Sequence, residues 1–237
     1  MGKEGVSDAD KERRAALKEE IEAIEKKAGS SSGRYAFFDA VYEEASGDEA
    51  RVPWADLEPK AELLQWLAEN PARPDQRAVD VGCGLGDNAE ALASAGYDTV
   101  AFDYSEKAVN WARKRFPDTA VSYRAADLFD LPPDWVGGFD LVNECFTLQA
   151  LPPDMLERTA AAVASLVKPG GTLLIYTRYE PGGRPNGPPW PLPEERLNMF
   201  EAVGFDKKED RRFELFRQDG SAMLHAFIVW VRRTADA

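Results

Sequence analysis

Residues 78–92 of the chain, AVDVGCGLGDNAEAL, decide the fold. The stretch starts as a short apolar strand that ends at Val81, passes through a turn with glycine at 82, 84 and 86, and then takes a helical pattern. Glycines at a strand-to-helix turn let a ligand approach the backbone, and the N-terminus of the following helix favours an anionic group. Ligands of open parallel sheets bind at such carboxyl ends of strands. The stretch therefore predicts a ligand site at the edge of a parallel sheet.

From this stretch onward, short apolar runs alternate with helical patterns. The predicted strands cover 78–81, 98–103, 120–125, 139–142 and 171–177, and the predicted helices start near 87 and cover 105–115 and 153–167. After a helix near 194–203, two strand-like runs are joined by Asp219-Gly220, a dipeptide typical of hairpin turns. We therefore predict an α/β fold: a doubly wound, seven-stranded, mostly parallel, Rossmann-like sheet that ends in an antiparallel hairpin.

The N-terminal part of the chain differs from the rest. Residues 7–28 combine an apolar helical stripe with many charges, and residues 29–33, GSSSG, are typical of a linker. Residues 35–69 are helical in pattern, with a break at VPWADLEPK. We expect an N-terminal charged helix and linker over 1–33 as a helical extension, and a single domain over 34–237.

Composition and charge exclude several classes of protein. The 237 residues include 29 Lys and Arg against 42 Asp and Glu, a formal net charge of −13, which disfavours nucleic-acid and membrane-surface partners. No apolar run reaches membrane-spanning length, and the charged N-terminus is not typical of a secretory signal. Two cysteines and one histidine are too few for a disulfide scaffold or for most zinc sites. We expect a cytoplasmic protein without a metal, as a monomer or a homodimer.

Carboxylates follow two more of the predicted strands. Asp103 ends the second strand, where a carboxylate can accept hydrogen bonds from both hydroxyls of a ribose. Asp127 comes directly after the third strand, where a carboxylate can accept a hydrogen bond from the exocyclic amine of adenine. Together with the glycine turn, these two positions predict a nucleoside ligand.

The spacing alone leaves the kind of nucleoside open. The dinucleotide fingerprint Gly-x-Gly-x-x-Gly/Ala fails when counted from Gly82 and passes when counted from Gly84, so a nicotinamide cofactor remains an alternative. Two features disfavour a nicotinamide cofactor. Asp80 is suited to bind a cationic amine, and the glycine turn has no basic residue that could bind a diphosphate.

These segments resemble those of the class I S-adenosylmethionine-dependent methyltransferases. The resemblance rests on DVGCGLG, on Asp103, on the Asp127 segment, on FDLVNECF and on VKPGGTLLIY, and it covers about residues 78–177. It implies S-adenosylmethionine as the cofactor, with the glycine turn and Asp80 at the methionine part, Asp103 at the ribose, and Asp127 with the Leu128 amide at the adenine. The implied cofactor-binding residues are Asp80, Gly82, Cys83, Gly84, Gly86, Asp103, Tyr104, Asp127, Leu128, Asn143 and Glu144.

Motifs that the sequence lacks restrict the class of molecule that can accept the methyl group. Asn143-Glu144-Cys145-Phe146 follows the fourth strand instead of the Asn/Asp-Pro-Pro-aromatic or Pro-Cys motifs of nucleic-acid methyltransferases, which favours a small-molecule acceptor. Glu144 is the candidate general base, with Asp140 and Tyr179 behind it. We interpret His225 as a structural histidine and Cys145 as a small buried residue.

A second resemblance concerns the acceptor directly. Residues 146–174 and Trp54 are similar to the branch that contains thiopurine and halide/thiol methyltransferases, in which an upstream Trp helps to close the site. This implies that the methyl acceptor is a thiol or another soft nucleophile. An acceptor that ionises easily does not need a general base. The candidate substrate and lid residues are Phe38, Tyr42, Trp54 and Tyr179. A nicotinamide-dependent oxidoreductase and a non-catalytic nucleoside-binding protein remain the alternatives.

Overall fold

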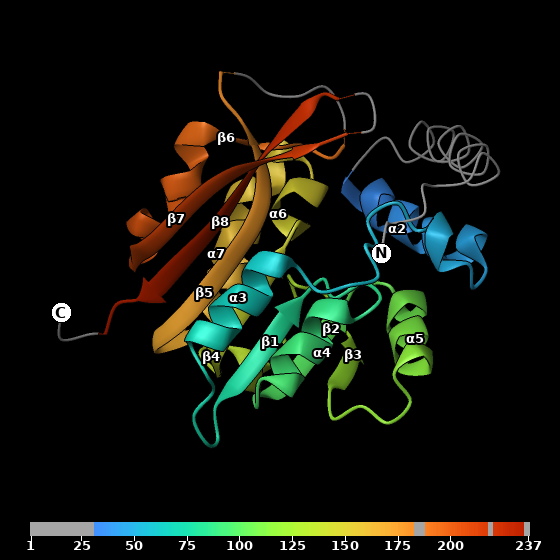
Figure 1. Ribbon diagram of the computed structural model, residues 1–237, viewed down its shortest axis with the longest axis horizontal. Coiled ribbons are helices and arrows are strands. Elements are labelled where there is room, and N and C mark those ends of the chain that lie inside the picture. The colour runs from blue at the N-terminus through green and yellow to red at the C-terminus, as the bar shows by residue number, and fades with distance from the viewer. Residues whose placement is uncertain (1–30, 183–187, 218–219, 235–237) are drawn as a thin grey trace, which may run out of the picture.

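A computed structural model of the chain describes residues 31–182, 188–217 and 220–234. Within these residues, seven strands form one mixed sheet in the order β3-β2-β1-β4-β5-β8-β7 (Figure 1). The strands are β1 (Arg77–Val81), β2 (Asp98–Asp103), β3 (Ser122–Ala125), β4 (Phe139–Cys145), β5 (Val167–Glu180), β7 (Phe205–Phe216) and β8 (Ala222–Arg232). A two-residue strand, β6 (Leu192–Pro193), pairs with β5 off this path.

Only β8 runs against its neighbours. It pairs antiparallel with β5 on one side and with β7 on the other, whereas β1 to β5 pair in parallel. The carboxyl ends of the parallel strands therefore meet at one edge of the sheet. The predicted seven-stranded, doubly wound sheet with a terminal antiparallel hairpin is confirmed.

Helices cover both faces of the sheet. The α-helices are α2 (Ser31–Ala45), α3 (Ala61–Glu69), α4 (Asp87–Ser94), α5 (Glu106–Arg115), α6 (Thr147–Ala150) and α7 (Leu156–Leu166). The 3-10 helices are η1 (Glu49–Arg51), η2 (Pro133–Trp135), η3 (Pro153–Met155) and η4 (Glu194–Val203). Residues of α3 and α4 pack on one face, and residues of α7 and η4 pack on the other.

The core consists mainly of two apolar layers, one on each face. Leu63 and Trp66 of α3 pack with Leu141 and Phe227 of the sheet. On the opposite face, residues of α7 and η4 pack against the strand side chains that alternate with those of the first layer. Val142, which follows Leu141 in β4, is one of them. Strands buried on both faces need apolar residues at successive positions, which is why the sequence shows continuous apolar runs there.

The structure corrects the end of the fourth strand. The prediction ended it at residue 142, but β4 continues to Cys145. Asn143 and Glu144 are strand residues because they pair in register with Asp80 and Val81 of β1. Polar residues are depleted in strands, so their pattern indicated a loop. The predicted helix near 194–203 is likewise a 3-10 helix rather than an α-helix.

The start of α2 differs from the predicted linker. Ser31–Gly33 were assigned to the linker 29–33, yet they form the first turn of α2. Serine and glycine are as typical of helix starts as of linkers, so composition does not separate the two. The predicted helix 7–28 lies outside the described residues, and the division into 1–33 and 34–237 remains a prediction. Among the helices described, none is long and apolar enough to cross a membrane.

Candidate active site

The glycine turn has left-handed backbone angles at all three glycines. The φ angles are +64° at Gly82, +52° at Gly84 and +94° at Gly86. A Cβ at Gly82 would lie 2.5 Å from Oγ1 of Thr147, and a Cβ at Gly86 would lie 2.3 Å from the Tyr123 hydroxyl. The turn therefore requires glycine for backbone conformation and for packing, as well as for the ligand access that the sequence predicted.

Asp80 presents a buried carboxylate oxygen without a partner directly before this turn. Its Oδ1 accepts a hydrogen bond of 2.7 Å from Nδ2 of Asn143, whereas Oδ2 has no partner among the described residues. Burial raises the pKa of Asp80 to about 7. An unpaired buried oxygen of this kind is unusual, and a cationic group is the partner that would stabilise its ionised form.

Glu144 is the second buried acid at this edge, with an exposed fraction of 0 %. Its Oε1 accepts a hydrogen bond of 2.9 Å from the amide of Leu148 in α6, and its Oε2 has no partner within the described chain. Burial raises the pKa of Glu144 to about 8. The side chain thus holds α6 in place with one oxygen, while its other oxygen is buried without a hydrogen-bond partner among the described residues.

Asp103 links the end of β2 to the glycine turn. Its Oδ2 accepts a hydrogen bond of 3.0 Å from the amide of Gly84, and its Oδ1 accepts one of 2.9 Å from the amide of Ser105. Burial raises the pKa of Asp103 against the lowering effect of these hydrogen bonds. The amide of Cys83 donates to the Phe102 carbonyl at 2.9 Å, which fixes the turn to β2 a second time.

Asp127 and Tyr104 lie further along the same edge. Oδ1 of Asp127 accepts a hydrogen bond of 2.8 Å from the amide of Phe129, and the neighbouring Leu128 is buried. Tyr104 is 48 % exposed, and its ring stacks on that of Tyr35 of α2 at 4.2 Å between centroids. Burial and, to a smaller extent, the charge of Asp127 raise the pKa of Tyr35 to about 12.

We call the set Asp80, Gly82–Gly86, Asp103 and Asp127 the rim. It fits the predicted cofactor in two respects: Asp80 has a buried acceptor atom to spare for a cationic amine, and the glycine turn leaves the backbone uncovered by its own side chains. Asp103 ends β2, the neighbour of β1, and Asp127 follows β3, the next strand on that side of the sheet. The structure therefore brings the predicted cofactor-binding residues to one edge of the sheet.

The predicted lid residues from the N-terminal region also come together. The Trp54 ring packs edge-on against Phe38 and Tyr42, at 5.4 and 5.6 Å between centroids, and its Nε1 donates to the Tyr42 hydroxyl at 2.9 Å. That hydroxyl lies 3.3 Å from the position of a Cβ at Gly84. These aromatic side chains therefore cover the glycine turn.

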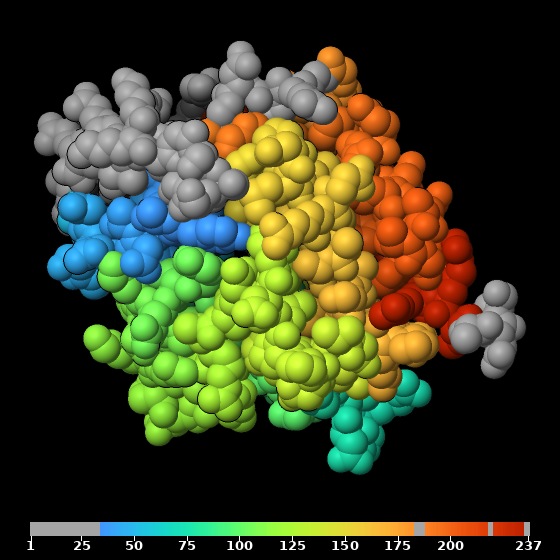
Figure 2. Space-filling view, turned by 180° about the vertical axis from the view of Figure 1, so that it is seen from behind, coloured from blue at the N-terminus to red at the C-terminus, as the bar shows by residue number. Residues whose placement is uncertain are grey.

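Helix α2 is fixed over the rim by polar contacts that the sequence did not indicate. Asp39 accepts hydrogen bonds of 2.7 Å from the Ser105 hydroxyl and from Nζ of Lys107. Nε of Arg34 donates to the Ala150 carbonyl at 2.8 Å. Figure 2 shows α2, in blue, against the green segment that contains α5, and its far end reaches the yellow segment that contains α6.

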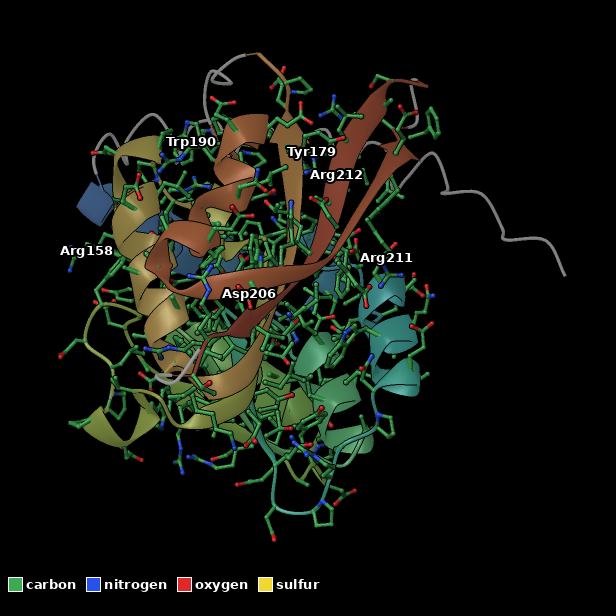
Figure 3. All side chains as sticks on the ribbon, turned by 90° about the vertical axis from the view of Figure 1, so that its left-hand side faces the viewer. Arg158, Tyr179, Trp190, Asp206, Arg211 and Arg212 are labelled. Atoms are coloured by element: carbon green, nitrogen blue, oxygen red, sulfur yellow. The ribbon has the colours of Figure 1, made fainter. Side chains whose placement is uncertain are left out.

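Two residues that the sequence predicted for the site pack away from the rim. Tyr179 packs against the core on the α7 side, with the guanidinium of Arg212 at 4.7 Å from its ring centroid (Figure 3). Asp140, the reserve candidate for a base, accepts a hydrogen bond from the Arg77 amide at 3.0 Å and pairs with Lys168. It lies near the amino end of β4, so this interpretation was wrong: the side chain is at the edge of the sheet opposite the rim.

Of the remaining candidates, His225 is buried and Cys145 is partly buried. Nδ1 of His225 lies 2.9 Å from the Met223 carbonyl, and its ring stacks on Phe213 at 5.7 Å between centroids. Burial raises the pKa of the Cys145 thiol and lowers that of His225. Among the described residues, no group of three or more His, Cys, Asp or Glu side chains is arranged to hold a metal ion.

Sequence reasoning missed three residues that shape the rim: Tyr35, Asp39 and Thr147. Tyr35 has a weak signal, because it shares helical spacing with Phe38 and Tyr42. Asp39 and Thr147 have none, because their partners, Ser105 and Gly82, are more than sixty positions away in sequence.

The sheet order, the terminal hairpin and the rim together define a class I S-adenosylmethionine-dependent methyltransferase. The model of the thiopurine S-methyltransferase family matches residues 44–222, and the chain belongs to this family. This membership confirms the predicted class, its cofactor and the predicted branch.

Relatives with known sequences and structures agree with this assignment. A probable thiol methyltransferase of Arabidopsis thaliana is 30 % identical over 164 residues, 68 % of this chain and 70 % of that protein. A ubiquinone biosynthesis O-methyltransferase of Xanthomonas campestris is 38 % identical over 116 residues, and the chain spans about half the length of such relatives, 48 % in this case. The magnesium protoporphyrin IX methyltransferase of Synechocystis, solved with bound S-adenosylmethionine, shares the fold with a TM-score of 0.65 at 18 % identity, covering 84 % of this chain and 97 % of that one.

Proposed function

We propose that the protein transfers the methyl group of S-adenosylmethionine to a small-molecule acceptor with a soft nucleophile, a thiol in the first place. One observation carries the proposal: Asp80 and Asp103 lie at the carboxyl ends of β1 and β2, and Asp127 follows β3, so three carboxylates line one edge of the sheet beside the glycine turn. The preference for a thiol is supported by the thiopurine S-methyltransferase family and by the similarity to a probable thiol methyltransferase.

Each rim residue has a proposed task toward the cofactor. Oδ2 of Asp80 would pair with its amine, Asp103 would accept from its ribose hydroxyls, and Asp127 with the Leu128 amide would bind its adenine. The exposed ring of Tyr104 offers a stacking surface beside them. When bound, the cofactor supplies an electrophilic methyl group on a sulfonium.

On the acceptor side, the chain positions the acceptor and excludes water. Phe38, Tyr42 and Trp54 cover the glycine turn and would keep solvent from it. Glu144 is the proposed base for acceptors that must lose a proton, because burial raises its pKa to about 8, which favours taking up a proton, and its Oε2 is free of hydrogen bonds within the described chain. A thiol that is already ionised would not need it.

Calorimetry and a transfer assay test the proposal together. Titration with S-adenosylhomocysteine and, separately, with the reduced nicotinamide dinucleotides should give binding of the first only. Incubation with labelled S-adenosylmethionine and a panel of thiols, phenols and amines should label a thiol. Exclusive nicotinamide binding would restore the oxidoreductase alternative, and cofactor binding without transfer to any acceptor would favour the nucleoside-binding alternative.

Location and assembly follow from the same proposal. We propose a cytoplasmic monomer or homodimer that binds neither nucleic acid nor a membrane surface, since the net charge of −13 repels both. Light scattering of the purified chain and a binding titration with duplex DNA test these points directly.

A further inference from the structure

Two cationic side chains gather beside Phe146 at the carboxyl ends of β4 and β5. Nζ of Lys60 lies 4.7 Å from the centroid of the Phe146 ring, and the guanidinium carbon of Arg178 lies 5.6 Å from it. Phe146 follows the last residue of β4, and Arg178 lies near the end of β5. The pair therefore lies at the same edge of the sheet as the rim.

Among the described residues, Arg178 has no carboxylate within ion-pair distance. Its amide donates to Oε1 of Gln149 at 2.6 Å, so its backbone is fixed, but its half-buried guanidinium forms no hydrogen bond or ion pair within the described chain. Burial and the positive charge of Arg217 lower the pKa of Arg178. An arginine held in this way is an unfavourable arrangement that a bound anion would relieve.

Lys60 also extends its side chain toward the Phe146 ring. Its amide donates to Oδ1 of Asn88 at 3.0 Å, next to the glycine turn, and only 15 % of its side chain is exposed. Its ammonium group pairs with Asp56, which is the one carboxylate with an ion pair to either cation among the described residues. Two cations and one carboxylate leave an excess of positive charge, although the whole chain carries −13.

Phe146, the ring that both cations approach, has a strained backbone conformation. Its φ angle is +69°, a left-handed value that a bulky side chain adopts only when its surroundings enforce it. Its amide donates to the Tyr176 carbonyl at 3.0 Å, and the Tyr176 ring lies 5.0 Å from Nζ of Lys60. Such strain is typical of binding sites, where it positions a side chain that the ligand meets.

We propose that Arg178 and Lys60 bind a carboxylate of the acceptor, so that the acceptor is an organic acid that also carries the atom to be methylated. This inference rests on the proposed methyl transfer and names its substrate class. Nε of Arg178 is buried, so the two terminal guanidinium nitrogens are the donors left for a carboxylate, and Lys60 adds a second positive charge beside the same Phe146 ring.

The test compares two probes of equal shape, 4-nitrobenzoate and the neutral 4-nitrobenzamide. The full chain is saturated with S-adenosylhomocysteine, and the binding of each probe is followed by calorimetry. We expect the carboxylate to bind at least about tenfold more tightly than the amide, as charge-assisted hydrogen bonds to a partly buried guanidinium provide. Equal binding of the two probes would overturn the inference.

Three variants test whether Arg178 causes the preference for the carboxylate probe over the amide probe. Arg178→Gln should abolish the preference for the carboxylate, and Arg178→Lys should retain part of it because the charge remains. Arg233→Gln is the matched control, since it removes a cation that pairs with Asp206 at the opposite edge of the sheet, and it should retain the full preference. A preference that survives Arg178→Gln would contradict the inference.

The same samples separate this inference from the function on which it rests. Binding of S-adenosylhomocysteine together with equal affinity for both probes would reject the carboxylate site alone. No binding of S-adenosylhomocysteine to the wild-type chain would reject the proposed methyl transfer, and the acceptor site with it.

Discussion

Oδ1 of Asp80 on β1 accepts a hydrogen bond of 2.7 Å from Nδ2 of Asn143 on β4, while Oδ2 of the same buried carboxyl group has no partner among the described residues. The two strands are neighbours in the sheet, and the two residues are in register. The amide of Asn143 therefore orients the carboxyl group and leaves one oxygen for a ligand. Burial raises the pKa of this carboxyl group, and the hydrogen bond from Asn143 opposes that rise.

Cofactor binding should depend on pH through Asp80. Its pKa is raised to about 7 by burial, so the carboxyl group is protonated below that pH and cannot pair with a cationic amine. We expect the affinity for S-adenosylhomocysteine to rise between roughly pH 6 and pH 8, by up to about tenfold per pH unit below the pKa. Calorimetry across this range measures it.

Variants of two aspartates supply the controls for this prediction. Asp80→Asn should bind more weakly and lose the dependence on pH. Asp98→Asn, an exposed position at the amino end of β2, should keep the wild-type profile. An Asp80→Asn chain with an unchanged profile would show that another group controls binding.

Gly82 should resist replacement more than a glycine with the same backbone angle. Gly82 and Gly137 both have φ of +64°, but a Cβ meets Oγ1 of Thr147 at 2.5 Å in the first case and nothing within 4 Å in the second. Gly137→Ala should lower the free energy of unfolding by about 1–2 kcal/mol. Gly82→Ala should lower the free energy of unfolding by about 1 kcal/mol or more in addition, because the new Cβ overpacks the site.

Chemical denaturation compares these variants. Adding Thr147→Ala to Gly82→Ala should recover most of the additional loss, because it removes the hydroxyl that the new Cβ meets. Equal losses for the two single alanine variants would mean that the turn relaxes and that packing against Thr147 does not constrain it.

Asp103→Ala should weaken the binding of S-adenosylhomocysteine by about 1–3 kcal/mol, because the ribose hydroxyls lose their acceptor. The same change also removes the acceptor of the Gly84 and Ser105 amides, so the melting temperature is measured beside the affinity. Asp48→Ala, which removes an exposed carboxylate that accepts from the Ala50 amide, serves as the control. Wild-type affinity in the Asp103→Ala chain would reject the role of this residue.

Glu144→Gln should separate acceptors by their acidity. If Glu144 is the base, the variant loses about 100-fold or more in transfer to a phenol and stays within about tenfold of wild type for a thiol that is ionised at the assay pH. The amide keeps an oxygen for the Leu148 hydrogen bond, so α6 should stay in place. Losses of the same size for both acceptors would assign Glu144 a structural task only.

The part of the fold that the sequence predicted correctly is the part with short-range signals. Val81 and the glycines after it identify a strand, a turn and a helix within fifteen residues, and buried parallel strands are continuous apolar runs. The end of β4 lacked this signal: Asn143 and Glu144 are polar, and they belong to the strand because Asp80 and Val81 lie beside them. Pairing between residues more than sixty positions apart cannot be read from a local pattern.

The same limit applies to the site. The carboxylates of the rim were predictable because each lies at or just after the carboxyl end of a strand, and parallel strands bring these ends together. The contacts of α2 were not, since Asp39 meets Lys107 only after the chain has folded. Tyr179 was predicted as a lid residue because it lies past the end of the predicted fifth strand. In the structure β5 continues to Glu180, and the Tyr179 ring packs against the core.

The most direct test of the account is a crystal structure of the protein grown with S-adenosylhomocysteine. We predict that its amine lies against Oδ2 of Asp80, its ribose hydroxyls against Asp103, and its adenine between Asp127 and Tyr104. A ligand bound away from the rim, or density at the rim that fits a diphosphate instead, would contradict the assignment of these residues and the methyl transfer built on them.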